Sequence, residues 1–316
     1  MRREFKVRSN VDGLELDGLA VEPGEGTKWI GLMQISHGMS EYKERYLPFM
    51  EYMAEKGIVC VIHDHRGHGK SIRREKDLGY MYGAGGAGLV SDLYQVTCWA
   101  KKEYPGLPFI LLGHSMGSLV VRTYTKTRDQ ELDALIVCGS PSNNYLRPLG
   151  SVLGHMEAAL LGEEHRSSLL ETLSFGSFAA RFSEEKSRFA WCCSDPKVVE
   201  EYESSPLCGF TFSDDAFFAL NDLLKETYGY HGWRCSRPKL PVLFVSGGED
   251  PCYVSVRRFK QSIDHMRFMG YHNIRGKLYP GMRHEILNEK EKYRVYEDIW
   301  KWLLQTRVIE RKKEES

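Results

Sequence analysis

Five short apolar runs recur along the chain, and segments with a helical repeat of apolar positions separate most of them. The runs are continuously apolar rather than alternating, which is typical of parallel strands buried on both faces of a sheet. Between two of these runs, residues 45–57 place their apolar side chains on one helical face and end at Gly57. The alternation predicts an α/β fold built from β–α–β units. The five runs are residues 29–36, 58–64, 108–114, 134–140 and 241–247.

The two ends of the chain follow other patterns. Residues 4–9 and 14–23 alternate more clearly between polar and apolar positions, which predicts an antiparallel hairpin at the edge of a mostly parallel sheet. Near the other end, a short apolar run at 277–281 precedes an amphipathic helix over 290–305. The charged residues that follow predict a solvated tail.

The strand rhythm stops between residues 141 and 240, where no strand-like run occurs and aromatic residues gather. A stretch of this length between two strands of one sheet is too long for a loop, so we expect it to contain helices of its own. We interpret it as a helical cap inserted after the sixth strand, over the carboxyl edge of the sheet. The predicted units are a core over 1–140, the cap over 141–240, the rest of the core over 241–308 and the tail over 309–316.

The composition of the chain indicates which classes of partner to expect and in which cellular compartment the protein works. Lys and Arg number 43, as do Asp and Glu, so no basic excess indicates a nucleic-acid partner. The start of the chain has no apolar leader, and no apolar run approaches the roughly 20 residues of a membrane span, so we expect a soluble, cytoplasmic protein. The 8 cysteines lack CxxC spacing, and Cys60 and Cys138 lie in strand-like runs, which favours buried thiols over disulfides or structural zinc.

Ser115 is the first candidate for chemistry. It lies in "GHSMG", between Gly113 and Gly117, where an apolar strand meets a helical pattern. A helix-capping serine in a glycine turn would be the simpler interpretation, but it leaves the two flanking glycines unexplained. A nucleophile elbow explains them, because its turn is so tight that only glycine fits on either side of the serine.

A serine nucleophile needs a base whose tautomer is held by a carboxylate, and both follow in the required order. Asp250 comes directly after the strand at 241–247, in "GGEDP". His284 comes after the next strand, in "GMRHEILNE". The order serine, aspartate, histidine at one sheet edge predicts a catalytic triad.

The same reasoning predicts an oxyanion hole made of two backbone amides. One amide is that of Met116, which follows the nucleophile. The other is that of Met39, in the loop "SHGMSEYKERY" after the third strand. No metal and no organic cofactor is expected for this chemistry.

With these residues in place, the chain resembles the monoacylglycerol lipase and lysophospholipase branch of the α/β-hydrolases, often grouped with serine aminopeptidases of the S33 type. The resemblance covers residues 14–304 and rests on "HGMSEYKERY", "DHRGHGKS", "GHSMGS", "GGEDP" and "RHEILNE". It implies the α/β-hydrolase fold and the catalytic and oxyanion roles named above. It also implies that Glu41 and Arg45, near the oxyanion loop, help to arrange the polar head of the substrate.

The expected function is hydrolysis of a carboxylic ester through an acyl-enzyme, with one acyl chain on a polar alcohol as substrate. A peptidase of the same fold is the nearest alternative, and it would need carboxylates for the substrate's ammonium group. A non-catalytic binding protein is the alternative of another class, which the complete triad disfavours; a haloalkane dehalogenase would need aspartate in place of the serine. The carboxylates that the cap offers are Glu163, Glu164, Asp214, Asp215 and Asp222.

Two other motifs receive structural interpretations. "HDHRGH" at 63–68 has the histidine spacing of a metal motif, but Gly67 stands where that motif needs aspartate, so we expect Asp64 and Arg66 to hold a glycine-rich turn instead. "YGAGGAG" at 82–88 lacks the lysine of a phosphate loop. We predict a mobile loop there, before a helix that begins near Leu89.

The cap contains an apolar stripe over residues 151–162. Such a stripe is usually core. Above a lipase-like site it would instead line an acyl channel or touch a membrane surface transiently. The aromatic surface would also allow a homodimer without requiring one.

Overall fold

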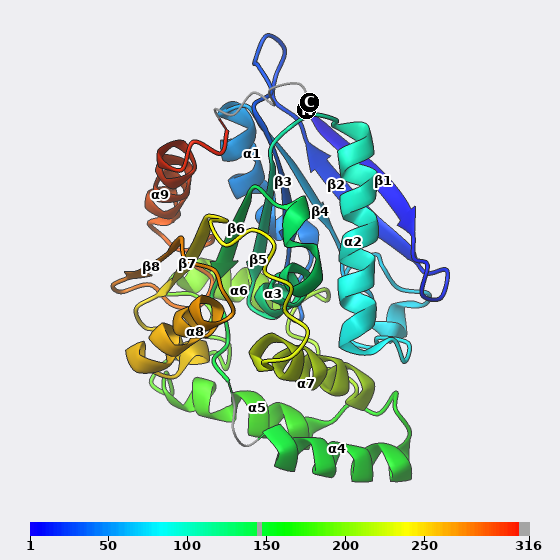
Figure 1. Ribbon diagram of the computed structural model, residues 1–316. Coiled ribbons are helices and arrows are strands. Elements are labelled where there is room, and N and C mark those ends of the chain that lie inside the picture. The colour runs from blue at the N-terminus through cyan, green and yellow to red at the C-terminus, as the bar shows by residue number, and fades with distance from the viewer. Residues whose placement is uncertain (144–146, 310–316) are drawn as a thin grey trace.

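The computed structural model describes the backbone of residues 1–143 and 147–309, and the side chains of the same residues except 147–151. Within this part of the chain, eight strands form one sheet in the order β1-β2-β4-β3-β5-β6-β7-β8, which crosses the centre of the molecule (Figure 1). Strand β2 runs antiparallel to both of its neighbours, and every other pair is parallel. The strands are β1 (Arg2–Arg8), β2 (Glu15–Val21), β3 (Gly31–Ser36), β4 (Ile58–His63), β5 (Phe109–His114), β6 (Ala134–Cys138), β7 (Val242–Gly247) and β8 (Ile274–Tyr279).

The predicted hairpin and the five predicted strand runs are confirmed. Every residue of β3 to β7 is buried, as continuous apolar runs require when helices cover both faces of a sheet. The parallel register pairs the end of β3 with the end of β5, and the end of β7 with the end of β8. The loops that follow these four strands therefore meet at one edge.

Helices cover the two faces of the sheet in two apolar layers (Figure 1). One layer contains the helix that follows β3 and the helix that follows β8. The other layer contains the helices that follow β4, β5 and β7. The first layer holds α1 (Leu47–Glu55) and α9 (Lys292–Gln305); the second holds α2 (Gly85–Glu103), α3 (Met116–Arg128) and α8 (Val256–Phe268).

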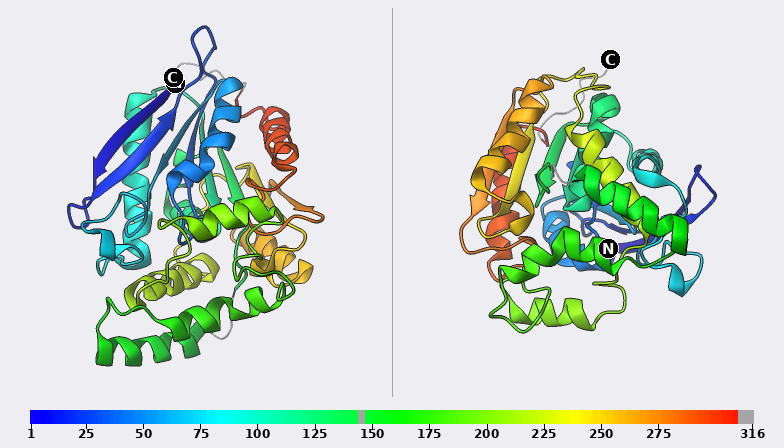
Figure 2. Two further views of the ribbon diagram at one scale, coloured as in Figure 1. Left: turned by 180° about the vertical axis from the view of Figure 1, so that it is seen from behind. Right: turned by 90° about the horizontal axis from the view of Figure 1, so that it is seen from below.

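The segment between β6 and β7 contains helices of its own, as predicted. Helices α4 and α5 lie beneath the carboxyl edge of the sheet both in Figure 1 and in the left view of Figure 2. Helix α7 packs against α2 and α3, and its Ala216, Ala219 and Leu223 join the apolar layer of the main core. The four helices are α4 (Arg147–Leu161), α5 (Ser168–Ala180), α6 (Pro196–Ser204) and α7 (Asp214–Tyr228).

The prediction of a loop up to Leu89 is wrong, because α2 begins at Gly85. A Cβ on Gly86 would lie 3.0 Å from the carbonyl oxygen of Ala219 and 3.1 Å from Asp222 Cβ. Gly86 is required because α7 passes so close to α2, whereas Gly83 and Gly85 have φ values of 68° and 60°, in the left-handed region that favours glycine.

Near the carboxyl terminus, Val308 and Ile309 are buried against the layer that holds α9. The predicted tail boundary at 309 therefore includes one residue that packs on the core. Residues 310–316, which carry the rest of that prediction, lie outside the described residues. Within the described part, none of the helices combines the length and the apolar character that crossing a membrane would take.

Candidate active site

Ser115 lies in the turn between β5 and α3 with φ 52° and ψ −120°, a strained conformation for a residue with a side chain. The chain approaches itself closely on both sides of it. A Cβ on Gly113 would lie 2.3 Å from the carbonyl oxygen of Gly117, and a Cβ on Gly117 would lie 2.1 Å from that of Ser36. The two glycines are thus required by close backbone contacts, as a nucleophile elbow demands.

Asp250 and His284 are brought together from the loops after β7 and β8. His284 Nδ1 lies 3.0 Å from Asp250 Oδ1, and both side chains are buried. The hydroxyl of Ser246 donates to Asp250 Oδ2 at 2.6 Å, and the backbone N–H of Cys252 donates to Oδ1 at 2.8 Å. Burial alone would raise the pKa of Asp250, but the charge and hydrogen bond of His284 hold that pKa below its ordinary value. The carboxylate can therefore fix the tautomer of the imidazole.

The other nitrogen of this histidine faces the cavity wall. His284 Nε2 lies 3.9 Å from the sulfur of Cys252, and Ser115 and His284 line the same cavity. Among the hydrogen bonds of the described residues, none joins the Ser115 hydroxyl to His284. Hydrogen bonds of this kind commonly tighten when substrate binds, so a longer separation does not exclude Ser115 and His284 as a pair.

The loop after β3 reaches the serine from the other side. A Cβ on Gly38 would lie 3.1 Å from Cβ of Ser115, so the backbone at residue 38 runs directly past this serine. The amide of Gly38 donates to Glu41, and the amide of Ser40 donates to Nε2 of His68 at 3.2 Å. Met39 stands between these two anchored amides, and Met116 opens α3 beside the serine. Both predicted oxyanion amides thus belong to segments that border Ser115.

Glu41 and Arg45 form one buried ionic network rather than two separate groups. Glu41 accepts from the N–H of Gly38 at 2.6 Å, from the Tyr46 hydroxyl at 2.8 Å and from Arg45 Nη1 at 2.9 Å. Arg45 also donates hydrogen bonds to both carboxylate oxygens of Glu285, at 2.7 and 2.6 Å. Burial alone would raise the pKa of Glu41, but the hydrogen bond from His114 and the charge of Arg45 keep it well below its ordinary value.

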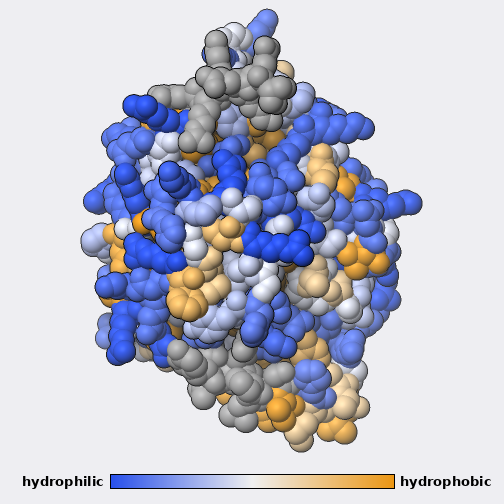
Figure 3. Space-filling model, in the orientation of Figure 1, coloured by the Kyte–Doolittle hydropathy of each residue, from blue (hydrophilic) through white to orange (hydrophobic). Residues whose placement is uncertain are grey.

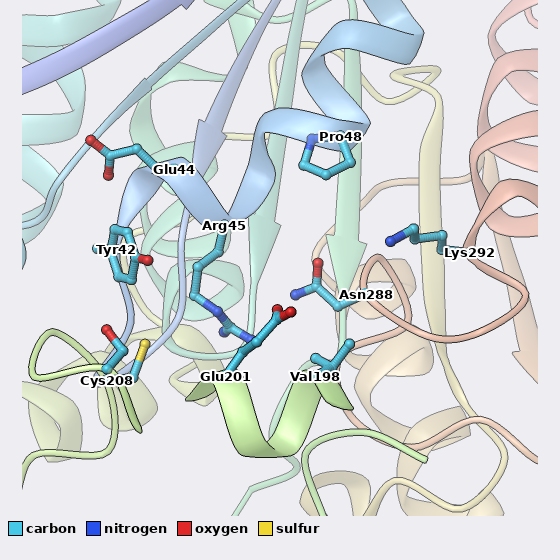
Figure 4. A pocket seen from close by; sticks show the side chains of 10 residues that line it. Tyr42, Glu44, Arg45, Pro48, Val198, Glu201, Cys208, Asn288 and Lys292 are labelled. Carbon is cyan, nitrogen blue, oxygen red and sulfur yellow. The ribbon is translucent and has the colours of Figure 1, made fainter. Parts of the chain in front are cut away.

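The two residues face different spaces. Glu41 lines the cavity that contains Ser115, whereas Arg45 lines a smaller pocket of about 250 Å³. Figure 4 shows Arg45 reaching from the short helix η1 (Lys43–Tyr46) toward Glu201 and Val198 on α6. Their predicted contact with a substrate head stays a prediction. In the structure their contacts join the loop after β3 to Glu285, the residue after His284.

A buried cluster of histidines supports the same loop. His37 Nδ1 lies 2.8 Å from the carbonyl oxygen of Gly38, and its Nε2 accepts the backbone N–H of His65 at 2.8 Å. Burial lowers the pKa of His68 to about 4 and that of His63 to about 3. These rings are therefore neutral at physiological pH, and their nitrogens can accept hydrogen bonds from the backbone.

The turn that carries "HDHRGH" is held as predicted. Asp64 accepts from Lys43 Nζ at 2.7 Å and from the backbone N–H of Lys70 at 2.9 Å. Arg66 donates to Asp92 at 2.7 Å and to the carbonyl oxygen of Met81 at 3.2 Å. Asp64 and Arg66 thus fix the glycine-rich turn to the neighbouring segments.

The cavity above Ser115 measures about 730 Å³, within the range of small-molecule sites. Its floor is made by the loop after β3, the serine elbow and His284, and its walls come largely from α5 and the segments on either side of α6. Phe175 stacks parallel to Trp191, and Phe178 meets Trp191 edge to face. The larger apolar residues of the walls include Leu173, Phe175, Phe178, Phe189, Trp191, Phe210, Leu220 and Leu224.

The carboxylates considered for a peptidase lie elsewhere. Asp215 accepts the backbone N–H groups of Met81 and Gly83, and the other four also stand apart from the residues that line the cavity. The acidic residues that do line it each contact an arginine: Glu41 and Glu285 contact Arg45, and Glu171 contacts Arg188. No carboxylate of the described cavity wall is thus left for a substrate ammonium group.

Sequence reasoning missed several residues of this site. Glu285 stands next to the predicted base, yet its partner Arg45 is 240 positions away. Cys252 follows Asp250 by two positions, and only the fold shows that its sulfur approaches His284. In the sequence, the only indication that Glu285 or Cys252 belongs to the site is that each stands close to a predicted catalytic residue.

Two groups of metal-ligating side chains occur in the part of the chain that the structure describes. One consists of Asp250, Cys252 and His284, and so coincides with the predicted acid and base. The second consists of Glu157, His165 and Asp214, away from the cavity.

The chain is similar in sequence and in structure to known hydrolases. The family model described as "Serine aminopeptidase, S33" matches residues 27–291. A monoacylglycerol lipase of Mycolicibacterium smegmatis is 26% identical over 87% of this chain and 88% of its own length. A thermostable carboxyl esterase from Bacillus coagulans has a structure with a TM-score of 0.86 at 24% identity, covering 98% of this chain and 99% of that one. A monoglyceride lipase from Saccharomyces cerevisiae gives a TM-score of 0.72 at 18% identity, covering 96% and 94% of the two chains.

Proposed function

The chain belongs to the serine aminopeptidase S33 family of α/β-hydrolases, and we propose that within it the chain is a serine carboxylic-ester hydrolase of the monoacylglycerol lipase or lysophospholipase type. Its relatives named as monoacylglycerol and monoglyceride lipases support a hydrolase that acts on acyl esters. The observation that carries the proposal is that Ser115 and His284 line one cavity with apolar walls, and that Asp250 holds the histidine from behind.

In the proposed mechanism, Ser115 attacks the ester carbonyl while His284 takes the hydroxyl proton. Asp250 holds the imidazole through Nδ1 and stabilises its charged form. The amides of Met39 and Met116 donate to the oxygen that becomes negative, each being worth roughly 10²- to 10³-fold in rate. His284 then gives the proton to the leaving alcohol, and water activated by the same histidine releases the acid.

An ester with one acyl chain suits the cavity better than a peptide. The walls offer aromatic and aliphatic side chains to a hydrocarbon chain, and the floor offers backbone amides and polar groups to the ester and the alcohol. An aminopeptidase needs a free carboxylate for the substrate's ammonium group, and Glu41, Glu171 and Glu285 are already occupied by arginines. The arrangement favours the ester.

The exposed side of the cap supports transient contact with a lipid surface. Helix α4 exposes Met156 and Leu160, the latter by 82%, so its apolar stripe is not buried as core. Figure 3 shows apolar residues gathered at this end of the molecule. Leu173 on α5 is 57% exposed and also lines the cavity, so it joins the outer apolar surface to the site. A substrate molecule would reach the cavity past this residue.

The substrate assignment is tested by initial rates on a monoacylglycerol, a lysophospholipid and an aminoacyl amide, with Ser115→Ala as the blank. We expect both lipids to be cleaved and the amide to be left intact. A second comparison uses Phe178→Asp, which should raise KM for a long-chain ester much more than for an acetyl ester of the same alcohol. Preference for the amide would contradict the proposal.

Contact with lipid is tested by flotation with phosphatidylcholine vesicles. The double variant Met156→Glu/Leu160→Glu should bind vesicles more weakly than the wild-type protein, because charged side chains replace the apolar stripe. Phe268→Glu is the matched control, since Phe268 is 75% exposed on α8, outside the cap. Equal binding by all three proteins would contradict a role for α4.

A further inference from the structure

A second cluster of chemically reactive side chains lies in the cap, outside the cavity. We propose that Glu157, His165 and Asp214 form a binding site for a divalent cation of the zinc type. The three residues come from α4, from the loop before α5 and from the first turn of α7. One ligand atom from each lies within 4.8 Å of the other two, and none of the three residues lines the cavity that contains Ser115.

Asp214 is the residue that most needs a partner. Its side chain is fully buried, and neither carboxylate oxygen accepts a hydrogen bond from the described residues. His165 Nδ1 points to the same place and is also buried without a hydrogen bond. Buried carboxylates are normally paired, hydrogen-bonded or bound to metal, so these two side chains together have the character of a ligand-binding group.

The spacing of the pair fits a shared metal ion better than a direct hydrogen bond. His165 Nδ1 lies 3.4 Å from Asp214 Oδ2. A charge-assisted hydrogen bond between these atoms would measure about 2.7–2.9 Å. Two ligands at roughly 2.0–2.1 Å from a tetrahedral Zn²⁺ lie about 3.3–3.4 Å apart, as these two atoms do.

Charge and orientation favour a cation at the same point. Glu157 and Asp214 bring two carboxylates together, and after burial it is the charge of Glu157 that raises the pKa of Asp214. Glu157 Oε2 accepts the hydroxyl of Ser167 at 2.6 Å, and that hydroxyl caps the start of α5. The backbone N–H of Asp214 donates to the carbonyl oxygen of His165 at 3.0 Å, which holds the two ligands side by side. Such supporting hydrogen bonds orient metal ligands in advance.

The donor set indicates which cation fits. One imidazole with two carboxylates suits Zn²⁺, whereas Ca²⁺ and Mg²⁺ prefer sets made of oxygen atoms alone. His165 is 30% exposed, so water can complete a four-coordinate shell from the open side. A bound ion would tie α4 to α7, and α7 packs on α2 and α3 of the main core. The ion would therefore fix the position of the exposed apolar helix.

The test is equilibrium dialysis of the metal-free full chain against Zn²⁺, with metal content measured per chain. We expect one Zn²⁺ at this site, and a rise in Tm of roughly 5 °C at a hundredfold excess of free Zn²⁺ over Kd. Ca²⁺ and Mg²⁺ should not produce the rise. His165→Gln and Asp214→Asn should weaken Zn²⁺ binding by at least about tenfold. Glu164→Gln, which removes an exposed neighbouring carboxylate, is the control and should bind as the wild type does.

Zinc at Cys252 and His284 has to be told apart from zinc in the cap. Cys252→Ser should keep the Zn²⁺-dependent rise in Tm, because its sulfur belongs to the other group. Co²⁺ substitution should give absorption without the thiolate-to-cobalt charge-transfer band that a cysteine ligand produces. Binding that Cys252→Ser abolishes, or a strong thiolate band, would overturn the proposal.

The difference in Tm between Asp214→Asn and the wild type should change sign with Zn²⁺, which a variant that simply folds poorly would not show. With chelator present, Asp214→Asn should have a Tm equal to or above that of the wild type, because it relieves the repulsion from Glu157. With Zn²⁺ present the order should reverse. A wild-type Tm that Zn²⁺ leaves unchanged, together with no Zn²⁺ retained after dialysis beyond that of Asp214→Asn, would contradict the site.

Discussion

The carboxylate of Glu41 accepts the backbone N–H of Gly38 at 2.6 Å, and Gly38 in turn borders Ser115 so closely that a Cβ on it would lie 3.1 Å from the serine Cβ. A buried acidic side chain thus sets the path of the loop that carries one proposed oxyanion amide. Arg45 connects the same carboxylate to Glu285, the residue after His284. The loop beside Ser115 and the loop that carries His284 are therefore joined through one ionic network.

Glu41→Ala should lower kcat by roughly 10²-fold, because the amide of Met39 loses its position in the transition state. KM should change little. Glu41→Gln keeps an oxygen that accepts the Gly38 amide, so its kcat should fall much less than that of Glu41→Ala. Steady-state kinetics on a soluble ester measure both, and Glu44→Gln, three residues further on in the short helix η1, is the control. A Glu41→Ala enzyme within about twofold of the wild type would contradict the bracing role.

Asp250→Asn should lower kcat by roughly 10⁴-fold, since an amide at this place favours the wrong tautomer of His284. Ser246→Ala is the matched control, because it removes the 2.6 Å hydrogen bond on the other carboxylate oxygen and leaves the imidazole bond in place. We expect Ser246→Ala to lower kcat by no more than about tenfold. Similar rates for Asp250→Asn and the wild type would exclude Asp250 from the triad.

The glycines of the elbow should tolerate no side chain. Gly117→Ala places a Cβ 2.1 Å from the carbonyl oxygen of Ser36, so the start of α3 must shift away from β3. We expect a loss of about 1–3 kcal/mol in the free energy of unfolding, together with a large fall in activity. Gly176→Ala on α5 is the control for stability, because its new Cβ would meet only Thr172 Cγ2 at 3.4 Å. Urea denaturation checks the stability, and an unchanged Gly117→Ala midpoint would contradict the close packing.

Much of this architecture could be predicted from the sequence. Strands buried on both faces are continuously apolar, so β3 to β7 stand out. Ser115 and Asp250 lie shortly after two of these strands, and His284 lies after the shorter run that forms β8. The start of α2 at Gly85 could not be predicted, because Gly86 is required by its close contact with Ala219 of α7, more than 120 positions later. A pattern along the chain reports local periodicity and does not report which distant segment comes close.

The cap was the least predictable part for the same reason. The stripe on α4 has the helical repeat of a core helix, yet Leu160 is 82% exposed. Periodicity shows that a helix has an apolar face, but it does not show what covers that face. The grouping of Glu157, His165 and Asp214 likewise depends on three segments that only the fold brings together.

Acid should destabilise the protein through its buried histidines. An unfolded histidine takes up a proton near pH 6.5, whereas burial lowers the folded pKa of His63 to about 3 and that of His68 to about 4. The unfolded state therefore binds more protons between these values, so stability is complete above about pH 6.5 and falls as the pH drops toward 4. His63, beside the charge of Lys43, should alone account for about 2–3 kcal/mol between pH 6.5 and 4.5.

The measurement is urea unfolding at pH 7 and pH 4.5. His63→Leu should show a smaller loss of stability between the two pH values than the wild type, while the exposed His272→Leu should show the same loss. An identical pH dependence in the wild type and His63→Leu would show that His63 does not remain neutral in the folded state.

The account depends most on Ser115 as the nucleophile, and a fluorophosphonate probe tests this directly. The wild-type protein should be labelled at one site, and mass spectrometry of the digested adduct should place the phosphonate on Ser115. Ser115→Ala should be unlabelled while keeping the wild-type Tm. Labelling on another residue, or equal labelling of Ser115→Ala, would contradict the proposed mechanism.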